Sequence, residues 1–168
     1  MALIGGGLVV NQPGWEQLLE SNKQLHADTF VRSARFVSQY ESTLPADKFV
    51  DQLNQNAGNV LSSSERSTAI NRFGGAQDSS NLTARGLVVR QIAEDPDLVA
   101  AEKNRAFVLA QYFGYLRRNP DDPPEANRDY SGYDFWLTKL NDFKGDYVAA
   151  QMVKAFISSS EYRQRFGL

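Results

Sequence analysis

Apolar side chains return every three or four residues along most of the chain, which is the spacing of one face of an α-helix. The pattern is clearest over residues 46–57, 82–93 and 97–116. No segment alternates between apolar and polar positions over the length of a strand. We therefore predict an all-α fold, a compact bundle of about seven to eight helices joined by short loops.

Residues that cap or break helices fall between these apolar runs. Ser62 and Glu65 have the spacing of a capping box, and Asn81 is placed to cap the helix that follows it. Gly58 suits the left-handed conformation with which many helices end. The remaining helices are predicted to begin near Trp15, Asp28, Trp136, Gly145 and Ser160.

The first fourteen residues are expected to be a flexible lead-in or the remnant of a longer chain, followed by one all-helical domain over residues 15–168. The opening MALIGGGLVV is apolar, but it lacks the cationic start and the cleavage site of a signal peptide. The alternative is a short arm that docks on a neighbouring protein, because exposed apolar ends usually find a partner. An oligomer could form through such an arm.

Composition excludes several classes of function. The net charge is −2 and the 18 basic residues are scattered among 20 acidic ones, whereas nucleic-acid binding needs clustered cations. The absence of cysteine excludes disulfides, thiolate zinc sites and cysteine nucleophiles. No apolar run is long enough to span a bilayer. The only histidine is His26 and no Gly-x-Ser-x-Gly motif accompanies it, so we expect a non-enzymatic protein with no cofactor.

A proline-rich loop over residues 119–133 is the strongest candidate for a ligand site. It is predicted not to be helical, because prolines remove amide donors. Calcium takes six to eight oxygen ligands, and the loop is rich in them, although its spacing is not that of an EF-hand. The alternative is that these side chains only cap helices and set turns. The candidate metal ligands are Asn119, Asp121, Asp122, Glu125 and Asp129.

Aromatic residues gather around the same loop, where they could form a sugar-binding or peptide-binding groove. Phe113 and Trp136 lie on apolar helical stripes and are expected in the core. Tyr115, Tyr130 and Tyr133 are expected to be exposed, and they are the candidate binding surface.

The chain also carries an internal repeat. Phe30-Val31 and Phe36 fall on Phe107-Val108 and Phe113 at one offset. Phe49-Val50, Leu53-Asn54 and Gly58 fall on Trp136-Leu137, Leu140-Asn141 and Gly145 at a larger offset, and the proline-rich loop accounts for the difference. Short helices cannot bury their apolar faces alone, so two copies are expected to form related helical units over residues 28–75 and 104–167.

Three segments within residues 104–167 carry a family resemblance: YFGYLRRNPDD, SGYDFWLTKLNDFKGD and MVKAFISSSEYRQRFG. They resemble the domain of unknown function 4214 family, common in large, exported, modular bacterial proteins. The family pattern joins an Arg-Asx-Pro-Asp segment (residues 118–121), a Gly-x-x-x-Trp helix start (132–136) and a closing Ser-x-Glu-Tyr-x-x-Arg-Phe turn (159–166). Residues 28–75 look like a degenerate copy, with Phe49 in place of the tryptophan.

The resemblance implies an all-helical module without catalytic residues, in an exported or cell-surface setting. Together with the repeat, it favours a non-enzymatic interaction or assembly module. Its partner would be a protein or the neighbouring domains of a larger parent chain. The alternative is a calcium-binding or carbohydrate-binding module that uses the loop over residues 119–133.

Overall fold

The computed structural model describes residues 4–167 and confirms the all-α prediction. Within those residues it contains nine α-helices and one π-helical turn, and no strand. The chain divides into two compact units, Met1–Val99 and Ala100–Leu168. Each unit has its own cluster of buried apolar residues, and each is described by itself below.

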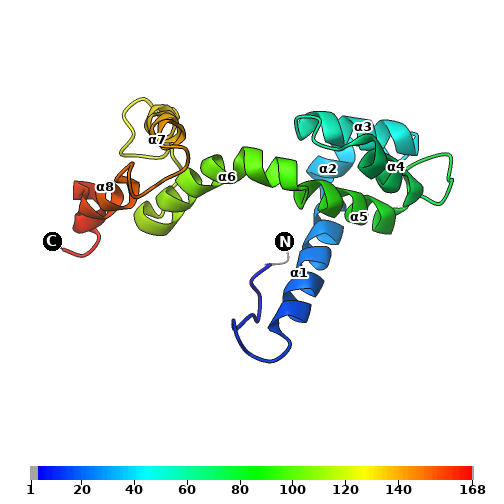
Figure 1. The fold of residues 1–168 in the computed structure, drawn as a ribbon, viewed down its shortest axis with the longest axis horizontal. Helices are drawn as coiled ribbons and strands as arrows, with labels where there is room; N and C mark the ends of the chain where they lie inside the picture. The colour runs from blue at the N-terminus through cyan, green and yellow to red at the C-terminus, as the bar shows by residue number, and fades with distance from the viewer. Residues whose placement is uncertain (1–3, 168) are drawn as a thin grey trace. The chain divides into compact units, whose positions relative to one another are not determined.

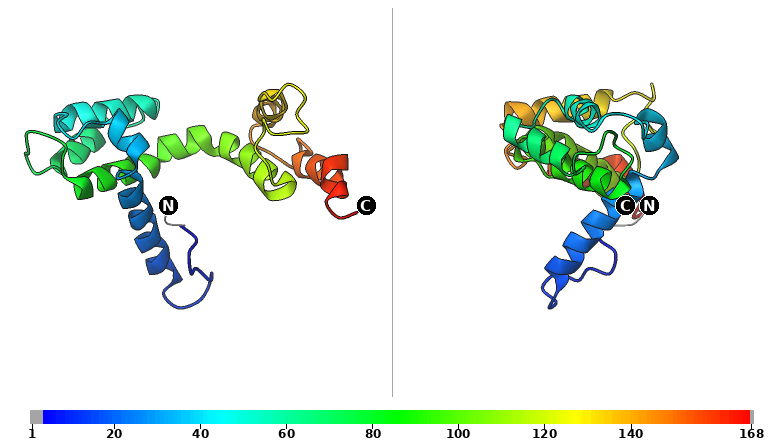
Figure 2. Two further views of the ribbon diagram at one scale, coloured as in Figure 1. Left: turned by 180° about the vertical axis from the view of Figure 1, so that it is seen from behind. Right: turned by 90° about the vertical axis from the view of Figure 1, so that its right-hand side faces the viewer.

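The first unit contains five complete helices (Figure 1). Helix α1 packs against α5, while α3, α4 and α5 contact one another, and short α2 connects α1 to this group. Figure 2 shows the same grouping from two other directions. The helices are α1 (Trp15–Phe30), α2 (Ala34–Gln39), α3 (Ala46–Asn56), α4 (Ser63–Asn71) and α5 (Leu82–Ala93).

Three of the predicted helix ends are confirmed. Ser62 caps α4 in a complete capping box with Glu65, and the Asn81 side chain accepts the amide of Ala84 at the start of α5. Gly58 follows α3 with a φ of 88°, a backbone conformation that costs glycine little. These ends depend on hydrogen bonds between neighbouring residues, which explains why the sequence reveals them.

The predicted helix start near Asp28 is wrong, because α1 continues through this point to Phe30. The Asp28 carboxylate accepts the Gln24 side-chain amide at 2.9 Å, within the same helix. The cap of the next helix is Ser33, whose hydroxyl oxygen accepts the Phe36 amide at 3.3 Å. A serine can satisfy a free amide at a helix start as well as an aspartate can, and the predicted helix start took no account of Ser33.

Phe49 lies at the centre of the first core and is fully buried. Its ring packs edge-on against Phe36 at 6.2 Å, Tyr40 at 5.8 Å and Phe73 at 5.7 Å. Edge-to-face contacts at these separations add to the stabilisation from burial. Helices α2, α3 and α4 are therefore joined mainly through aromatic side chains.

The same core contains a buried charged side chain, Arg85 of α5, which is 1% exposed. Its Nη1 donates to the Tyr40 carbonyl at 2.8 Å, its Nη2 donates to the Glu41 carbonyl at 2.6 Å, and its Nε donates to the Ser79 carbonyl. The guanidinium also lies 4.6 Å from the Phe49 ring centroid. Burial lowers the pKa of Arg85. Arg85 therefore ties two loops to α5 through backbone carbonyls.

Helices α1 and α5 approach closely at Gly86. A Cβ atom there would overlap Asp28 Oδ1 and lie 3.4 Å from Gln24 Nε2. A larger residue at this position would therefore require the Asp28 side chain to move, whereas the φ of Gly86 does not require glycine. The close approach brings the C-terminal half of α1 beside the C-terminal half of α5, where the site described below lies.

The second unit contains most of α6 (Pro96–Gln111), a π-helical turn (Tyr112–Leu116), α7 (Ser131–Asp142), α8 (Met152–Ser158) and α9 (Ser160–Gln164). Phe156 packs against Tyr112 at 5.2 Å and against the partly buried Trp136 at 5.6 Å. Residues 117–130 contain no helix, as predicted for the proline-rich loop. The buried apolar residues are Val108, Tyr112, Leu140, Ala150, Met152 and Phe156.

Phe113 was predicted to lie in the core. This prediction is wrong, because the residue is 50% exposed. The regular helix gives way at Tyr112 to a π-helical turn, which is wider than an α-helical turn and shifts the direction of the side chains that follow. Tyr112 takes the inward position and is 3% exposed. The apolar pattern allowed either residue to face inward, and the π turn selects Tyr112.

The helix predicted to start at Gly145 begins instead at Met152. The Asp146 carboxylate accepts the amides of Val148 and Ala149 at 2.9 Å each. Such local bonds offer the backbone an alternative to a helix, so residues 147–151 form turns.

The positions matched by the internal repeat agree in part. Val31 and Val108 are both fully buried, and Gly58 and Gly145 both have left-handed φ values, of 88° and 81°. Phe36 is buried whereas its counterpart Phe113 is exposed.

No helix among residues 4–167 is long and apolar enough to cross a membrane.

Candidate interaction site

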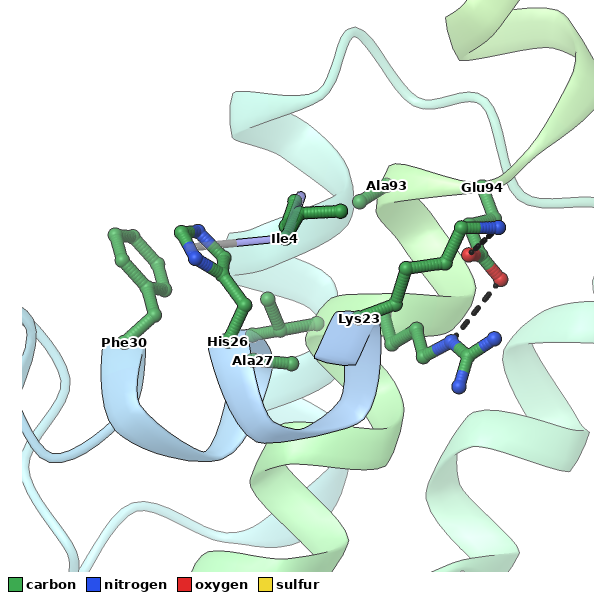
Figure 3. Close-up of a pocket in the computed structure, with 9 residues that line it drawn as sticks. Ile4, Lys23, His26, Ala27, Phe30, Ala93 and Glu94 are labelled. Atoms are coloured by element: carbon green, nitrogen blue, oxygen red, sulfur yellow. Dashed lines mark hydrogen bonds and ion pairs between the residues drawn. The ribbon is translucent and has the colours of Figure 1, made fainter. Parts of the chain in front are cut away.

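A hollow of about 420 Å³ lies between α1 and α5 in the first unit (Figure 3). Its wall is mostly aliphatic or aromatic, with His26 beside Phe30 at one end and Ala93 at the other. Both helices contribute because the contact at Gly86 holds them side by side. The lining residues are Ile4, Lys23, His26, Ala27, Phe30, Val89, Arg90, Ala93 and Glu94.

The charged groups at the rim of the hollow pair with one another. Lys23 Nζ lies 2.9 Å from a Glu20 carboxylate oxygen and 3.1 Å from a Glu94 oxygen. Arg90 Nε lies 3.2 Å from Glu94, and Arg90 also pairs with Glu20. Hydrogen bonds from Lys23 and Arg90 lower the pKa of Glu20. Lys23, Arg90 and Glu94 line the hollow, and Glu20 completes the pairing outside its lining. Because these charges are paired, the hollow favours an apolar ligand over a charged one.

His26 is the only histidine and the only candidate base for a catalytic triad. Among the described lining residues of its hollow there is no serine, threonine or cysteine. A nucleophile must lie within hydrogen-bond reach of its base. The described lining of this hollow therefore offers His26 no nucleophile.

The N-terminal segment, residues 4–14, folds back beside α1 (Figure 1). Asn22 Nδ2 donates to the carbonyl of Ile4 at 3.0 Å and to the carbonyl of Gly6 at 2.8 Å. The Ile4 side chain forms part of the hollow and is 41% exposed. The segment was predicted to be a flexible lead-in or an arm docking on another protein. The described part of it docks on the chain's own first unit.

A second hollow, of about 560 Å³, shares Phe30 with the first. Leu25 and Val37, close to Phe30 in the sequence, are 55% and 46% exposed. Exposed apolar side chains that gather in one region are typical of interaction sites. The second hollow is lined by Phe30, Ser33, Arg35, Phe36, Gln39, Tyr40 and Leu53.

Two of the predicted metal ligands of the proline-rich loop accept hydrogen bonds from nearby backbone and side-chain groups. Asp122 Oδ2 accepts both the backbone amide of Asn119 at 2.8 Å and its side-chain amide at 2.9 Å. Asp129 Oδ1 accepts the Ser131 amide at 3.0 Å, and hydrogen bonds from Ser131 lower the pKa of Asp129. These contacts are those of side chains that set turns.

Glu125 lies near the start of α7, where its carboxylate is 3.5 Å from the Ser131 hydroxyl, and Asp121 is partly buried. Within residues 4–167 no three acidic or histidine side chains gather closely enough to hold a metal ion. Calcium binding by this loop stays a prediction, and the positions of these acids do not support it.

The three tyrosines predicted as a binding surface have different surroundings. Tyr130 is 49% exposed and packs edge-on against the partly buried Tyr133 at 6.1 Å. Tyr115 packs against the second core and against Tyr162 at 5.9 Å. Of the three, only Tyr130 presents a largely free ring. A shared sugar-binding face stays a prediction.

In the second unit, Arg118 connects the segment over residues 118–121 with the segment over residues 159–166. Its Nε and Nη2 donate to the two carboxylate oxygens of Glu161 at 2.7 and 3.1 Å. Its Nη1 donates to the carbonyls of Asn119, Pro120 and Asp122. The hydrogen bond from Glu161 raises the pKa of Arg118. A hollow of about 200 Å³ lies over this pair, but the guanidinium already uses its donors within the protein.

Sequence reasoning missed the residues that form the hollow on α1 and α5. Ala93 belongs to no motif, Ile4 lies in a segment that was expected to be flexible, and Asn22, which holds that segment, belongs to no motif either. The one signal for the site was the apolar start of the chain, which was interpreted as an arm for a neighbouring protein. Its place beside α1 depends on contacts between residues far apart in sequence.

Comparisons of the chain with family models, with curated proteins and with solved structures found no match.

Proposed function

We propose that this protein is a non-enzymatic helical interaction or assembly module, and that the hollow between α1 and α5 binds an apolar side chain of a protein partner. The single observation that carries the proposal is the chemistry of that hollow. Most of its lining surface is apolar, and its charged residues Lys23, Arg90 and Glu94 are paired with one another or with Glu20 beside them. An apolar centre with a polar rim is the usual anatomy of a protein interface.

The size of the hollow sets the strength of binding expected from it. Fully burying one aliphatic or aromatic side chain contributes about 1.5 to 3 kcal/mol, which alone supports weak association. The second hollow next to Phe30 extends the apolar surface. A partner that fills both can therefore bind more firmly than one that fills the first alone, because each anchored side chain adds to the free energy.

We further propose that residues 104–167 form a unit of the domain of unknown function 4214 type. Contacts between the motif segments support this. Arg118 of the first segment pairs with Glu161 of the last, and Trp136 of the middle segment packs against Phe156. The residues that carry the resemblance thus hold one unit together. An exported or cell-surface setting would follow from that relationship.

The test of the proposed function is a comparison of binding by three versions of the full chain. Ala93→Glu places a carboxylate in the hollow at a solvent-exposed helix position, so the fold should tolerate it. Ala106→Glu is the matched control, since Ala106 is exposed on α6 and does not line the hollow. Each immobilised chain is exposed to an extract of the organism that encodes it.

We expect proteins that the wild type and Ala106→Glu retain to be lost from Ala93→Glu, because a buried carboxylate without a partner opposes binding. Light scattering on the same three chains reports self-association. If the three chains retain the same proteins and have the same mass in solution, the hollow is not the binding site.

A further inference from the structure

The wall of the hollow is completed by a residue from outside α1 and α5, the chain's own Ile4. We propose that two copies of the protein exchange their N-terminal segments, so that Ile4 of each copy completes the hollow between α1 and α5 of the other. The inference rests on the proposed function and names the partner as a second copy of the chain. Three observations support it: the contacts that hold Ile4, the exposed part of the segment, and the turns between Ile4 and α1.

The first unit holds the segment through features that any copy would offer. Asn22 donates to the backbone carbonyls of Ile4 and Gly6, and the Ile4 side chain forms part of the apolar wall of the hollow. None of these contacts depends on the segment belonging to the same chain. A segment that docks within one molecule can dock in the same way on an identical neighbour, which is the basis of domain swapping.

The segment is only partly covered in its present position. Ile4 is 41% exposed, and the two valines that follow the glycines, Val9 and Val10, are 53% and 65% exposed. Removing exposed apolar side chains from water is favourable, and a second copy brings additional surface to cover them. The intramolecular position therefore leaves apolar area that association can still bury.

The path from Ile4 to α1 can open without strain. The segment reverses direction through left-handed residues at Gly7 (φ 70°), Asn11 (φ 71°) and Gly14 (φ 85°). Glycine adopts positive and negative φ with similar ease, and asparagine tolerates the left-handed region better than most residues. Straightening these turns would direct the segment away from its own α1 and toward another molecule.

The chain contains no cysteine, so introduced thiols give a direct test of exchange. We mix full-length Ile4→Cys with full-length Ala93→Cys, one of them carrying an additional tag, and add a short bismaleimide. Both positions line the same hollow. Exchange predicts a covalent heterodimer in severalfold greater yield than from Ile4→Cys mixed with Ala106→Cys, whose thiol is exposed on α6 outside the hollow.

Two further variants separate exchange from random collision. Adding Ile4→Asp to the Ala93→Cys chain removes the apolar side chain with which that chain completes its own hollow, so the yield of heterodimer should increase. Adding Asn22→Ala to the same chain should decrease that yield, because the incoming segment loses its hydrogen bonds. The double variant Ile4→Cys/Ala93→Cys measures crosslinking within one chain. Crosslinking only within the double variant, with a mixed yield equal to the Ala106→Cys control, overturns exchange. The hollow could still bind another protein, and the Ala93→Glu comparison decides that separately.

Discussion

Replacing Arg85 by methionine should severely destabilise the first unit. The side chain is 1% exposed, and it donates to the carbonyls of Tyr40, Glu41 and Ser79. Among residues 4–167 no carboxylate forms an ion pair with it. Methionine fills a similar volume but leaves these carbonyls without their donors.

The magnitude follows from two opposing effects. A hydrogen bond to a charged group contributes about 1.5 to 3 kcal/mol, and a buried polar group left unpaired costs about 1 to 3 kcal/mol. The bonds to three carbonyls and a fourth bond to the Ser79 hydroxyl are lost, while the cost of burying the guanidinium, several kcal/mol, is recovered. The net loss in the free energy of unfolding should be about 3 kcal/mol. For a unit of this size that corresponds to a fall in melting temperature of roughly 10 °C or more.

The assay is urea unfolding followed by the fluorescence of Trp15, which belongs to the first unit, in a background with Trp136→Phe. Arg85→Lys should also lose stability, because an ammonium cannot reproduce the planar fork of a guanidinium. Arg35→Met is the control, since Arg35 is exposed and its loss should cost no more than about 0.5 kcal/mol. A loss below about 1 kcal/mol for Arg85→Met would refute this reasoning.

Three further predictions follow from other contacts. Gly86→Ala should displace the Asp28 carboxylate, so the cost of that movement should offset much of the gain in helix propensity of about 1 kcal/mol. In an Asp28→Ala background the same change should stabilise the chain by a few tenths to about 1 kcal/mol, and equal effects in both backgrounds would contradict the packing. Hydrogen bonds from Arg66 lower the pKa of Asp51 below its ordinary value of 3.8, so the folded state binds fewer protons. The stability that these hydrogen bonds contribute is complete above that value and is lost as the pH falls through the lower folded pKa. Below pH 4, Asp51→Asn should therefore lose less stability on acidification than the wild type. Parallel curves of unfolding free energy against pH for the two proteins would count against this. Calcium should leave the melting temperature unchanged, because the acids of residues 119–129 do not gather around one point, and a rise reversed by a chelator would restore the calcium hypothesis.

The fold class and several helix ends could be predicted because they depend on local pattern. The capping box at Ser62 and the left-handed glycine at position 58 follow from hydrogen bonds and sterics within a few residues. Helix α5 was placed correctly by its apolar spacing and by Asn81. These features require no knowledge of what the helix packs against.

Other features depend on competition between nearly equal alternatives. Tyr112 and Phe113 both fit the apolar stripe, and only the π turn decides that Tyr112 faces the core. Asp146 competes with the helix for the amides of residues 148 and 149, so α8 begins later than its apolar pattern suggests. Such outcomes are set by tertiary packing and by local bonds of similar strength.

The site itself was not predictable, because it joins residues far apart in the chain. Ile4, Asn22 and Ala93 meet only after α1 packs on α5 at Gly86 and the N-terminal segment folds back. Arg85 gave no signal either, since an arginine inside an apolar helix pattern is expected to face solvent. Its burial depends on carbonyls from two loops that the sequence does not bring together.

The most direct test of the account is whether the Ile4 side chain completes the wall of the hollow between α1 and α5. The chain has four isoleucines, so a sample labelled at isoleucine and alanine methyl groups gives a simple spectrum, in which Ile4→Val and Ala93→Ser identify the relevant signals. The account predicts a nuclear Overhauser effect between the Ile4 δ1 methyl and the Ala93 methyl, weakened by Asn22→Ala. An Ile4 methyl at its unfolded chemical shift, with no contact to Ala93 or Ala27, would contradict it.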